Sequence, residues 1–208
     1  MSKLKHILSF TIAAAVLMVA SPATAAVILT AGSTPALPGD TGDTLDIVLS
    51  NTGPSSIVVN SFNFEITVSN VAITFTDATT GTVAAPYIFS GHSLFGPDIA
   101  TSGPGQLLDA SDLFDTPASG ATVGAGVTVG LGHVFFNVSN AASGSYTVSF
   151  NPGSAATSLS DPNGGPITID QFNNGTITIP GASVPEPSAA IPVLAGLAWI
   201  CSRRRRSQ

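Results

Sequence analysis

Apolar and polar residues alternate along most of this chain, and that pattern constrains its fold more than any other feature. Every second residue is apolar in a series of short runs, many of them rich in β-branched and aromatic side chains. The clearest runs are residues 45–50, 62–68, 71–75, 134–138 and 146–150, with shorter ones at 167–169 and 177–179. A period of two is typical of half-buried β-strands, and no long window has the spacing of a helix.

Turn-forming residues separate these runs. Gly, Pro, Asn and Asp gather at residues 38–40, 52–54, 103–105, 151–153, 161–164 and 174–175. Short strands with turns between them predict an all-β fold, an antiparallel jelly-roll-like β-sandwich. Residues 81–120 are the least regular, and we expect short strands there, or one helical turn near 111–114, with a loop over one end of the sandwich. The Gly-rich run 121–132 predicts a strand with bulges or tight packing.

The charge distribution excludes some classes of partner. All six Lys and Arg residues lie at the two ends of the chain, and there is none between Ala26 and Ser202. The same span holds all twelve acidic residues. A nucleic-acid-binding protein needs cations to neutralise phosphates, so we exclude that role, and binding to anionic lipid headgroups is disfavoured. Neutral glycans, bound cations and basic surfaces of partner proteins remain open as ligands.

The N-terminus has the three parts of a secretory signal peptide. Two lysines precede an almost wholly apolar run at residues 7–20, and Ala23 and Ala25 are the small residues that a signal peptidase reads. We predict cleavage after Ala25, which makes Ala26 the new N-terminus. The alternative is an uncleaved membrane helix, but the apolar run is short and ends at a helix-breaking proline.

The C-terminus combines a short apolar run with a basic end. Residues 189–200 are about 18 Å long as a helix, against a hydrocarbon core of about 30 Å. We predict a short transmembrane segment at 188–202, followed by a stop-transfer cluster that stays in the cytoplasm. That cluster is Arg203, Arg204, Arg205 and Arg206. The only cysteine, Cys201, lies within the apolar stretch, so the domain before it contains no disulfide.

A sorting motif precedes this apolar run: Val184, Pro185, Glu186 and Pro187. The motif, the short apolar segment and the terminal arginines, in this order, resemble the PEP-CTERM sorting domain. The resemblance implies an exosortase-type enzyme that cleaves near the Pro-Glu-Pro, and export in association with exopolysaccharide and biofilm. The protein would be anchored in the inner membrane by its C-terminus before processing, and would then reach the cell surface or extracellular matrix. An unprocessed single-pass tail anchor is the alternative.

These features divide the chain into five parts. We predict a signal peptide at 1–25, a β-sandwich ectodomain at 26–180, a linker at 181–187, a transmembrane segment at 188–202 and a basic cytoplasmic tail at 203–208. The ectodomain begins with Leu37-Pro38-Gly39-Asp40, the alternating run 45–51 and a further run 57–66, and ends with a run at 174–179. These segments resemble a cohesin-type domain. The resemblance implies a nine-stranded jelly-roll sandwich, related to carbohydrate-binding modules, with a role in adhesion or scaffolding.

The sequence supports no catalytic chemistry. Ser93 lies in a near match to the G-x-S-x-G nucleophile elbow, but Phe95 displaces the second glycine. Glycoside hydrolysis needs two positioned carboxylates, and Glu65 is the only Glu of the domain. His92 and His133 have no second His or Cys at a metal-ligand spacing. We therefore predict that the protein is not an enzyme, with no catalytic residue and no assigned metal ligand.

Calcium and glycans remain open as ligands. Hard carboxylate oxygens suit Ca²⁺, and two groups of aspartates lie close in sequence: Asp40, Asp43 and Asp46, then Asp109, Asp112 and Asp115. Neither group matches an EF-hand loop, so solvated acids are the alternative, and we predict no required cofactor. A glycan would need an aromatic platform, for which the candidates are Tyr87, Phe89, Phe95 and Phe114, although rings in a β-rich sequence usually lie in the core.

The sequence as a whole predicts an exported, non-catalytic protein of the cell surface or extracellular matrix. Its expected partners are an exosortase-type processing enzyme and exopolysaccharide or another surface protein. The alternative is an adhesion module whose β-sandwich binds a glycan or a protein through a defined site.

Overall fold

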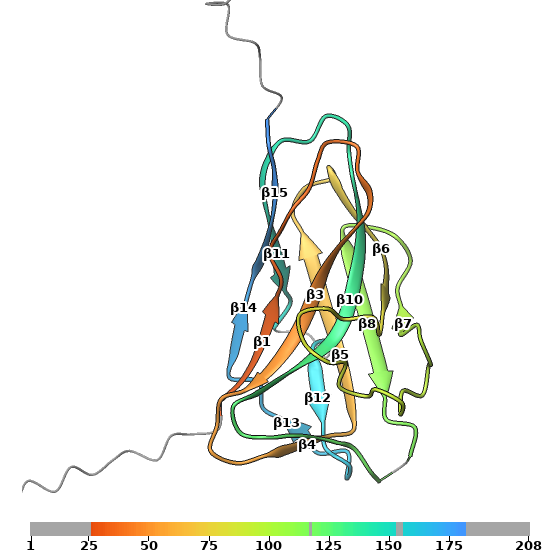
Figure 1. Ribbon diagram of the computed structural model, residues 1–208, viewed down its shortest axis with the longest axis vertical. Helices are drawn as coiled ribbons and strands as arrows, with labels where there is room; N and C mark the ends of the chain where they lie inside the picture. The colour runs from red at the N-terminus through yellow and green to blue at the C-terminus, as the bar shows by residue number, and fades with distance from the viewer. Residues whose placement is uncertain (1–25, 117, 153–155, 182–208) are drawn as a thin grey trace, which may run out of the picture.

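The computed structural model describes residues 26–116, 118–152 and 156–181. Every regular element in this part of the chain is a β-strand, and two packed sheets form a sandwich (Figure 1), which confirms the fold predicted from the alternating runs. The described part contains no helix that could span a membrane. The signal peptide, the sorting motif, the apolar tail and the terminal arginines lie outside the described residues.

The first sheet, sheet A, has five strands in the order β14-β1-β3-β10-β6. Their bounds are β1 (Val27–Ala31), β3 (Thr41–Asn51), β6 (Ile73–Thr79), β10 (Val127–Val138) and β14 (Gln171–Asn173). All neighbours are antiparallel except β1 and β14, which run parallel. The pairing of β10 with β3 shifts between Gly130 and Gly132, as expected of a bulge in the Gly-rich run 121–132. That run is not one strand, however, because it is divided between a short strand, β9 (Ala121–Val123), and the start of β10.

The second sheet, sheet B, is centred on β5 (Ser61–Val68). One edge of β5 pairs with β8 (Leu107–Leu113), which in turn pairs with β7 (Ala100–Thr101). The other edge is shared by β12 (Ser158–Ser160) and β11 (Gly144–Phe150). Beyond these lie β13 (Pro166–Ile167), β15 (Gly175–Ile179) and β2 (Thr34–Pro35), and a separate pair is formed by β4 (Ile57–Val59) and β9 (Ala121–Val123).

The core lies between the two sheets and is built from the alternating apolar residues. In β5 the burial pattern alternates strictly, so that Phe62, Phe64, Ile66 and Val68 are buried. Phe64 is fully buried, and Gly132 of β10 lies opposite it, because a Cβ at that position would come within 2.9 Å of the Phe64 ring. The alternation read from the sequence therefore corresponds to the inner and outer surfaces of each sheet.

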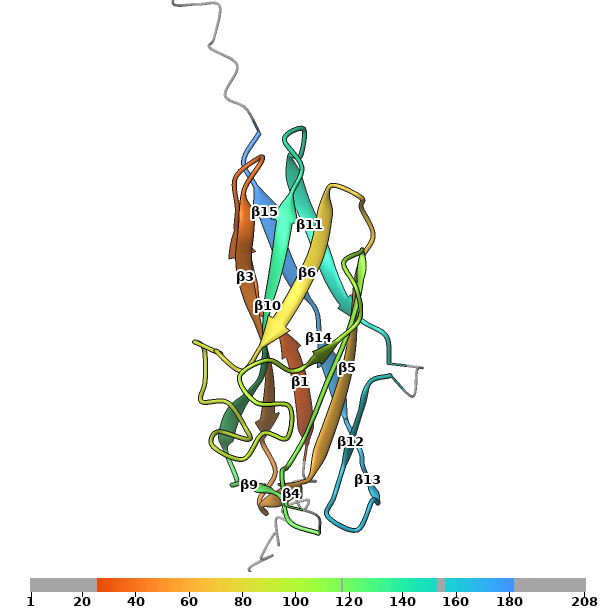
Figure 2. The same cartoon turned by 90° about the vertical axis from the view of Figure 1, so that its right-hand side faces the viewer.

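Residues 80–99, which we call the side segment, close one side of the sandwich (Figure 2). Ile88 N donates to Gly130 O on β10 at 2.9 Å, and Leu94 N donates to Leu113 O on β8 at 2.8 Å. The segment therefore bonds to a strand of each sheet. This differs from the loop expected over one end of the sandwich.

The helical turn offered as one option near 111–114 does not form, because β8 occupies residues 107–113. Leu108, Ala110 and Asp112 are the buried residues of β8, so an acid stands where an apolar residue is expected. β8 therefore does alternate between buried and outward residues, but the buried acid hides this alternation in the sequence.

Candidate functional site

The buried carboxylate of Asp112 organises the side segment. Asp112 is only 1% exposed. Its Oδ2 accepts hydrogen bonds from Tyr87 Oη and from Ser93 Oγ, each at 2.5 Å. Its Oδ1 accepts from Leu113 N at 2.7 Å and from Phe95 N at 3.4 Å. Four neutral donors thus compensate a buried acid that has no cation beside it, and they fix the path of the segment.

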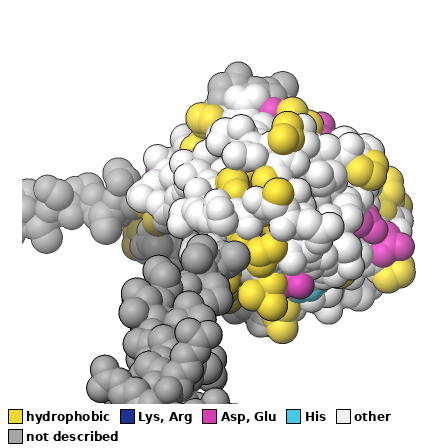
Figure 3. Space-filling model, turned by 90° about the horizontal axis from the view of Figure 1, so that it is seen from above, with side chains coloured by type: hydrophobic (Ala, Val, Ile, Leu, Met, Phe, Trp, Pro, Cys, Tyr) yellow, Lys and Arg dark blue, Asp and Glu magenta, His cyan; other side chains and the backbone are white. Residues whose placement is uncertain are grey.

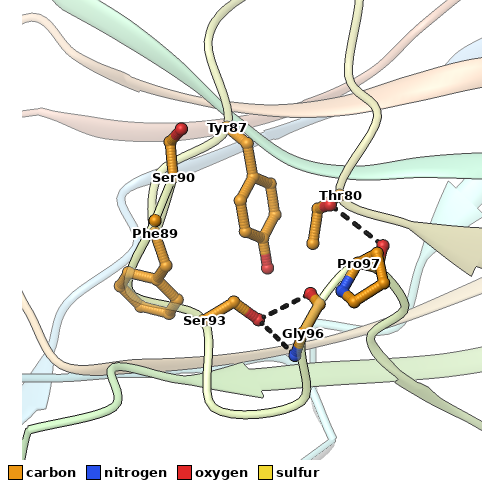
Figure 4. A pocket seen from close by; sticks show the side chains of 8 residues that line it. Thr80, Tyr87, Phe89, Ser90, Ser93, Gly96 and Pro97 are labelled. Carbon is orange, nitrogen blue, oxygen red and sulfur yellow. Dashed lines mark hydrogen bonds between the residues drawn. The ribbon is translucent and has the colours of Figure 1, made fainter.

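A cavity of about 390 Å³ lies beside this cluster (Figure 4). The Thr80 hydroxyl donates to Pro97 O at 2.9 Å, and the Ser93 hydroxyl lies 3.0 Å from Gly96 O. Burial raises the pKa of Tyr87 above its usual range, and the hydrogen bond to Asp112 adds to this effect. The hydroxyls of Thr80, Tyr87 and Ser93 are therefore committed to bonds within the side segment or to Asp112 of β8, which makes this cavity a poor candidate for ligand recognition.

A second carboxylate, that of Asp46 on β3, holds both a histidine and the tip of the side segment. His133 Nδ1 on β10 lies 2.5 Å from Asp46 Oδ1. Asp46 Oδ2 accepts from Val83 N at 2.6 Å and from Ala84 N at 2.5 Å. The Asp46 and His133 side chains are 6% and 14% exposed. This arrangement pins the side segment against the outer surface of sheet A.

The outer surface of sheet B is organised differently. We call the outward residues of β5 and β8 the docking face: Asn63, Glu65, Thr67, Leu107, Asp109, Ser111 and Leu113. In the strand register Glu65 lies directly opposite Asp109, and Asn63 directly opposite Ser111. Like charges that face one another across two strands are destabilising. No Lys or Arg among the described residues is available to relieve the pair.

A hollow of about 290 Å³ lies on the docking face, lined by Asn63, Asp109 and Ser111 and by hydroxyls at the end of β7. Asn63 Oδ1 is buried and has no hydrogen-bond partner among the described residues. A buried acceptor without a donor costs free energy. The hollow itself is lined by the carboxylate of Asp109 and by uncharged, mostly polar residues.

Apolar side chains stand at both ends of β8 on this surface. Leu107, at its first residue, is 43% exposed. At the other end, Leu113 is half-buried, and the neighbouring Leu94 of the side segment is 51% exposed. The distance along β8 from Leu107 to Leu113 is roughly 20 Å at about 3.3 Å per residue. The docking face thus has an acidic polar centre with apolar contacts on either side.

The aromatic residues considered as a glycan platform do not form one. Tyr87 and Phe89 are buried and pack against Phe62, with ring centroids 6.4 and 5.6 Å away. Phe114 is partly buried against the same core, and Phe95 is half-exposed. The structure therefore supports the alternative that these rings are mainly core residues.

Neither aspartate group forms a calcium site. Among the described residues there is no group of three or more His, Cys, Asp or Glu side chains placed to hold a metal ion. Asp109 points outward from β8 while Asp112 points inward, and Asp115 lies 3.3 Å from His92 Nδ1. In the other group, burial raises the pKa of Asp43, and the charge of Asp40 and its hydrogen bond add to this effect.

Ser93 has a structural role in the side segment. Its hydroxyl bonds to the carboxylate of Asp112 and to the backbone of Gly96. His92 is exposed, stacks on Phe114 with ring centroids 4.9 Å apart, and pairs with Asp115. Ser93 thus fixes a turn of the side segment.

Neither a protein-family model nor a curated protein matches the sequence. Solved structures do match. The non-cellulosomal cohesin of Archaeoglobus fulgidus is 16% identical over 76% of this chain and 94% of its own, with a TM-score of 0.53. A cohesin of Clostridium thermocellum, in complex with a dockerin, is 14% identical over 74% of this chain and 99% of its own, with a TM-score of 0.54.

The sixth cohesin of Acetivibrio cellulolyticus scaffoldin B, also in complex with a dockerin, is 15% identical over 74% of this chain and 99% of its own, with a TM-score of 0.55. At these identities the likeness concerns the fold. The described residues therefore form a cohesin-like β-sandwich, the architecture that the resemblance in the sequence implied.

Proposed function

We propose that this chain is an exported, non-catalytic surface protein whose β-sandwich binds another protein through the docking face. The observation that carries the proposal is the pair of acids Glu65 and Asp109, which lie opposite one another across β5 and β8. In the protein alone, the repulsion between these two carboxylates is unfavourable. A partner that supplies positive charge between them relieves this repulsion.

The chemistry of the face defines the partner. A Lys or Arg side chain inserted between Glu65 and Asp109 would donate to both carboxylates. Leu107 at one end and Leu94 with Leu113 at the other supply apolar contact around this polar centre. Two of the similar cohesin structures are of complexes with dockerins. We therefore propose a dockerin-like protein with a basic patch as the partner class.

Charge-reversal variants test this proposal. We would use the full-length chain to capture partners from a cell-surface extract, comparing wild type with the double variant Glu65→Lys/Asp109→Lys. The partner, once identified, should bind the variant at least about a hundredfold more weakly, because two favourable charge contacts become repulsive. The matched control is Asp77→Lys/Asp98→Lys, which makes the same charge change at two exposed positions, one in β6 and one in the side segment opposite the last residue of β6.

Equal loss of binding in the two double variants would mean that overall charge, and not the docking face, determines the interaction. Capture that persists unchanged in Glu65→Lys/Asp109→Lys would place the binding surface elsewhere.

The termini supply the route to the surface within the same proposal. Residues 1–25 act as a cleaved signal peptide, and Val184 to Pro187 act as a PEP-CTERM motif read by an exosortase, in the setting of exopolysaccharide and biofilm. Residues 188–202 hold the chain in the membrane until it is processed. The mature N-terminus should be near Ala26 by mass spectrometry, and deletion of residues 184–208 should change localisation. An intact Met1, or localisation unaffected by the deletion, would contradict this route.

A further inference from the structure

We propose a second binding site, for a neutral sugar unit, on the outer surface of sheet A. A cavity of about 280 Å³ lies there, between the tip of the side segment and the strands. Its walls include Thr30, Thr44, Asp46, Val83 and His133. Its volume is near the lower limit of ligand pockets, about 300 Å³, and suits a single ring. The site is on the opposite side of the sandwich from the docking face, so it does not depend on the proposed protein partner.

His133 is positioned for hydrogen bonding into this cavity. A carboxylate only accepts hydrogen bonds, so the contact with Asp46 Oδ1 assigns a hydrogen to His133 Nδ1. The backbone N–H groups of Val83 and Ala84 hold the other carboxylate oxygen. With Nδ1 occupied, Nε2 is the ring nitrogen left to accept a hydrogen bond from a ligand hydroxyl.

Three hydroxyls of the cavity, those of Thr30, Ser33 and Thr44, are free to donate, whereas the Thr34 hydroxyl donates to Pro35 O. Thr30 Oγ1 accepts from Asn173 Nδ2 at 3.2 Å, and Ser33 Oγ accepts from Thr176 N at 3.0 Å. Each hydroxyl hydrogen therefore remains available. Thr44 Oγ1 has no hydrogen-bond partner within the described part of the chain. Free donors beside a fixed acceptor match the hydroxyl groups of a sugar, each of which both donates and accepts.

Apolar groups provide the remaining walls. Val48 and Val83 line the cavity on the outer surface, and Val83 is 81% exposed. Phe135 lies next to His133 on the outer surface of β10, with ring centroids 5.1 Å apart. Mostly apolar walls with a few convergent polar groups are typical of small-ligand sites. The C–H groups of a sugar ring would pack against Val48 and Val83.

The charges indicate that the ligand is neutral. The Asp46 carboxylate is already satisfied by three donors, so it does not demand a cation. The described residues contain no Lys or Arg to bind an acidic sugar, and on the end viewed in Figure 3 the ionisable side chains seen among the described residues are acids and a histidine. A uronic acid or sugar phosphate would therefore be repelled.

Ligand-observed NMR tests the site directly. The purified full-length chain would be titrated separately with glucose, galactose, mannose and N-acetylglucosamine, and with glucuronate as the charged comparison. We expect at least one neutral sugar to bind with a Kd in the millimolar range, and glucuronate to bind at least about tenfold more weakly. Absence of binding by all four neutral sugars, or equal binding of glucuronate, would overturn the proposal.

Two variants locate the binding. His133→Ala should weaken binding about tenfold, the loss expected for one hydrogen bond. Thr44→Val keeps the Asp46–His133 contact and the shape of the wall, and should weaken binding about threefold or more. If His133→Ala does not fold, Thr44→Val decides the matter.

The controls are His92→Ala, which removes an exposed histidine paired with Asp115, and Asp109→Asn on the docking face. Both should bind the sugar as wild type does. If His92→Ala weakens binding as much as His133→Ala, or if Thr44→Val binds as wild type does, the proposed site is wrong. Because Asp109→Asn should weaken only the protein partner, failure at one face is distinguishable from failure at the other.

Discussion

Acidic side chains have opposite environments on the two outer surfaces of the sandwich. On sheet A, the Asp46 carboxylate is held by His133 and by two backbone N–H groups of the side segment. On sheet B, Glu65 and Asp109 face one another, and only Glu65 receives a side-chain donor, Asn151 Nδ2. Residue type alone is therefore no guide to the role of an acid. A carboxylate surrounded by internal donors organises the fold, and one that lacks them is available to a partner.

The largest loss of stability should come from a substitution in β8. In this strand a carboxylate held by internal donors and a carboxylate without them lie on opposite faces. Asp112→Ala removes a buried acceptor and leaves the donors Tyr87 and Ser93 unsatisfied, so it should lower the free energy of unfolding by about 4 kcal/mol. Asp109→Ala, three residues away and facing outward, should change it by less than about 0.5 kcal/mol. Urea denaturation measures both, and similar losses would contradict the distinction.

Asp46→Ala should have the next largest effect, lowering the free energy of unfolding by about 2 kcal/mol because it releases His133 and two backbone donors. Hydrogen exchange provides the specific readout. The amides of Val83 and Ala84 should lose protection, while those of β5 should keep it. Unchanged exchange at Val83 and Ala84 would show that another contact holds the side segment.

Gly130→Ala tests how closely the side segment approaches sheet A. A Cβ at this position would overlap the Thr82 side chain, so the variant should lose about 1–2 kcal/mol of stability by overpacking. The double variant Gly130→Ala/Thr82→Gly should recover part of that loss, as judged against Thr82→Gly alone in thermal denaturation. If the losses of the two single variants simply add in the double variant, the strain does not arise from contact between residues 130 and 82.

The smallest expected change in the free energy of unfolding is an increase. Glu65→Gln removes the repulsion with Asp109 and should raise the free energy of unfolding by a few tenths of a kcal/mol at low salt. The gain should shrink as salt is added, because an exposed repulsion is screened. A destabilised Glu65→Gln would mean that the docking face is internally satisfied, and would remove the main support for the proposed partner.

The strands were predictable where the alternation is undisturbed. In β5 each second residue is apolar, and the sequence alone placed Glu65 on the outer side. In β8 the buried Asp112 breaks the pattern, so the strand was not recognised, nor was its register with β5. The contact between Glu65 and Asp109 depends on that register, and the contact between Asp46 and His133 joins strands far apart in sequence. Local periodicity carries no information about either contact.

The lack of lysine and arginine throughout the described fold has a consequence for the environments that it tolerates. Among the described residues, both contacts between a carboxylate and a basic side chain involve histidine, and the buried acids Asp46 and Asp112 are held by hydrogen bonds rather than by attraction between distant charges. Dissolved ions therefore weaken repulsion between acids and find little attraction to disrupt. We expect the domain to keep its structure in brine, and to withstand swings in salinity that would loosen a sandwich fastened by surface ion pairs.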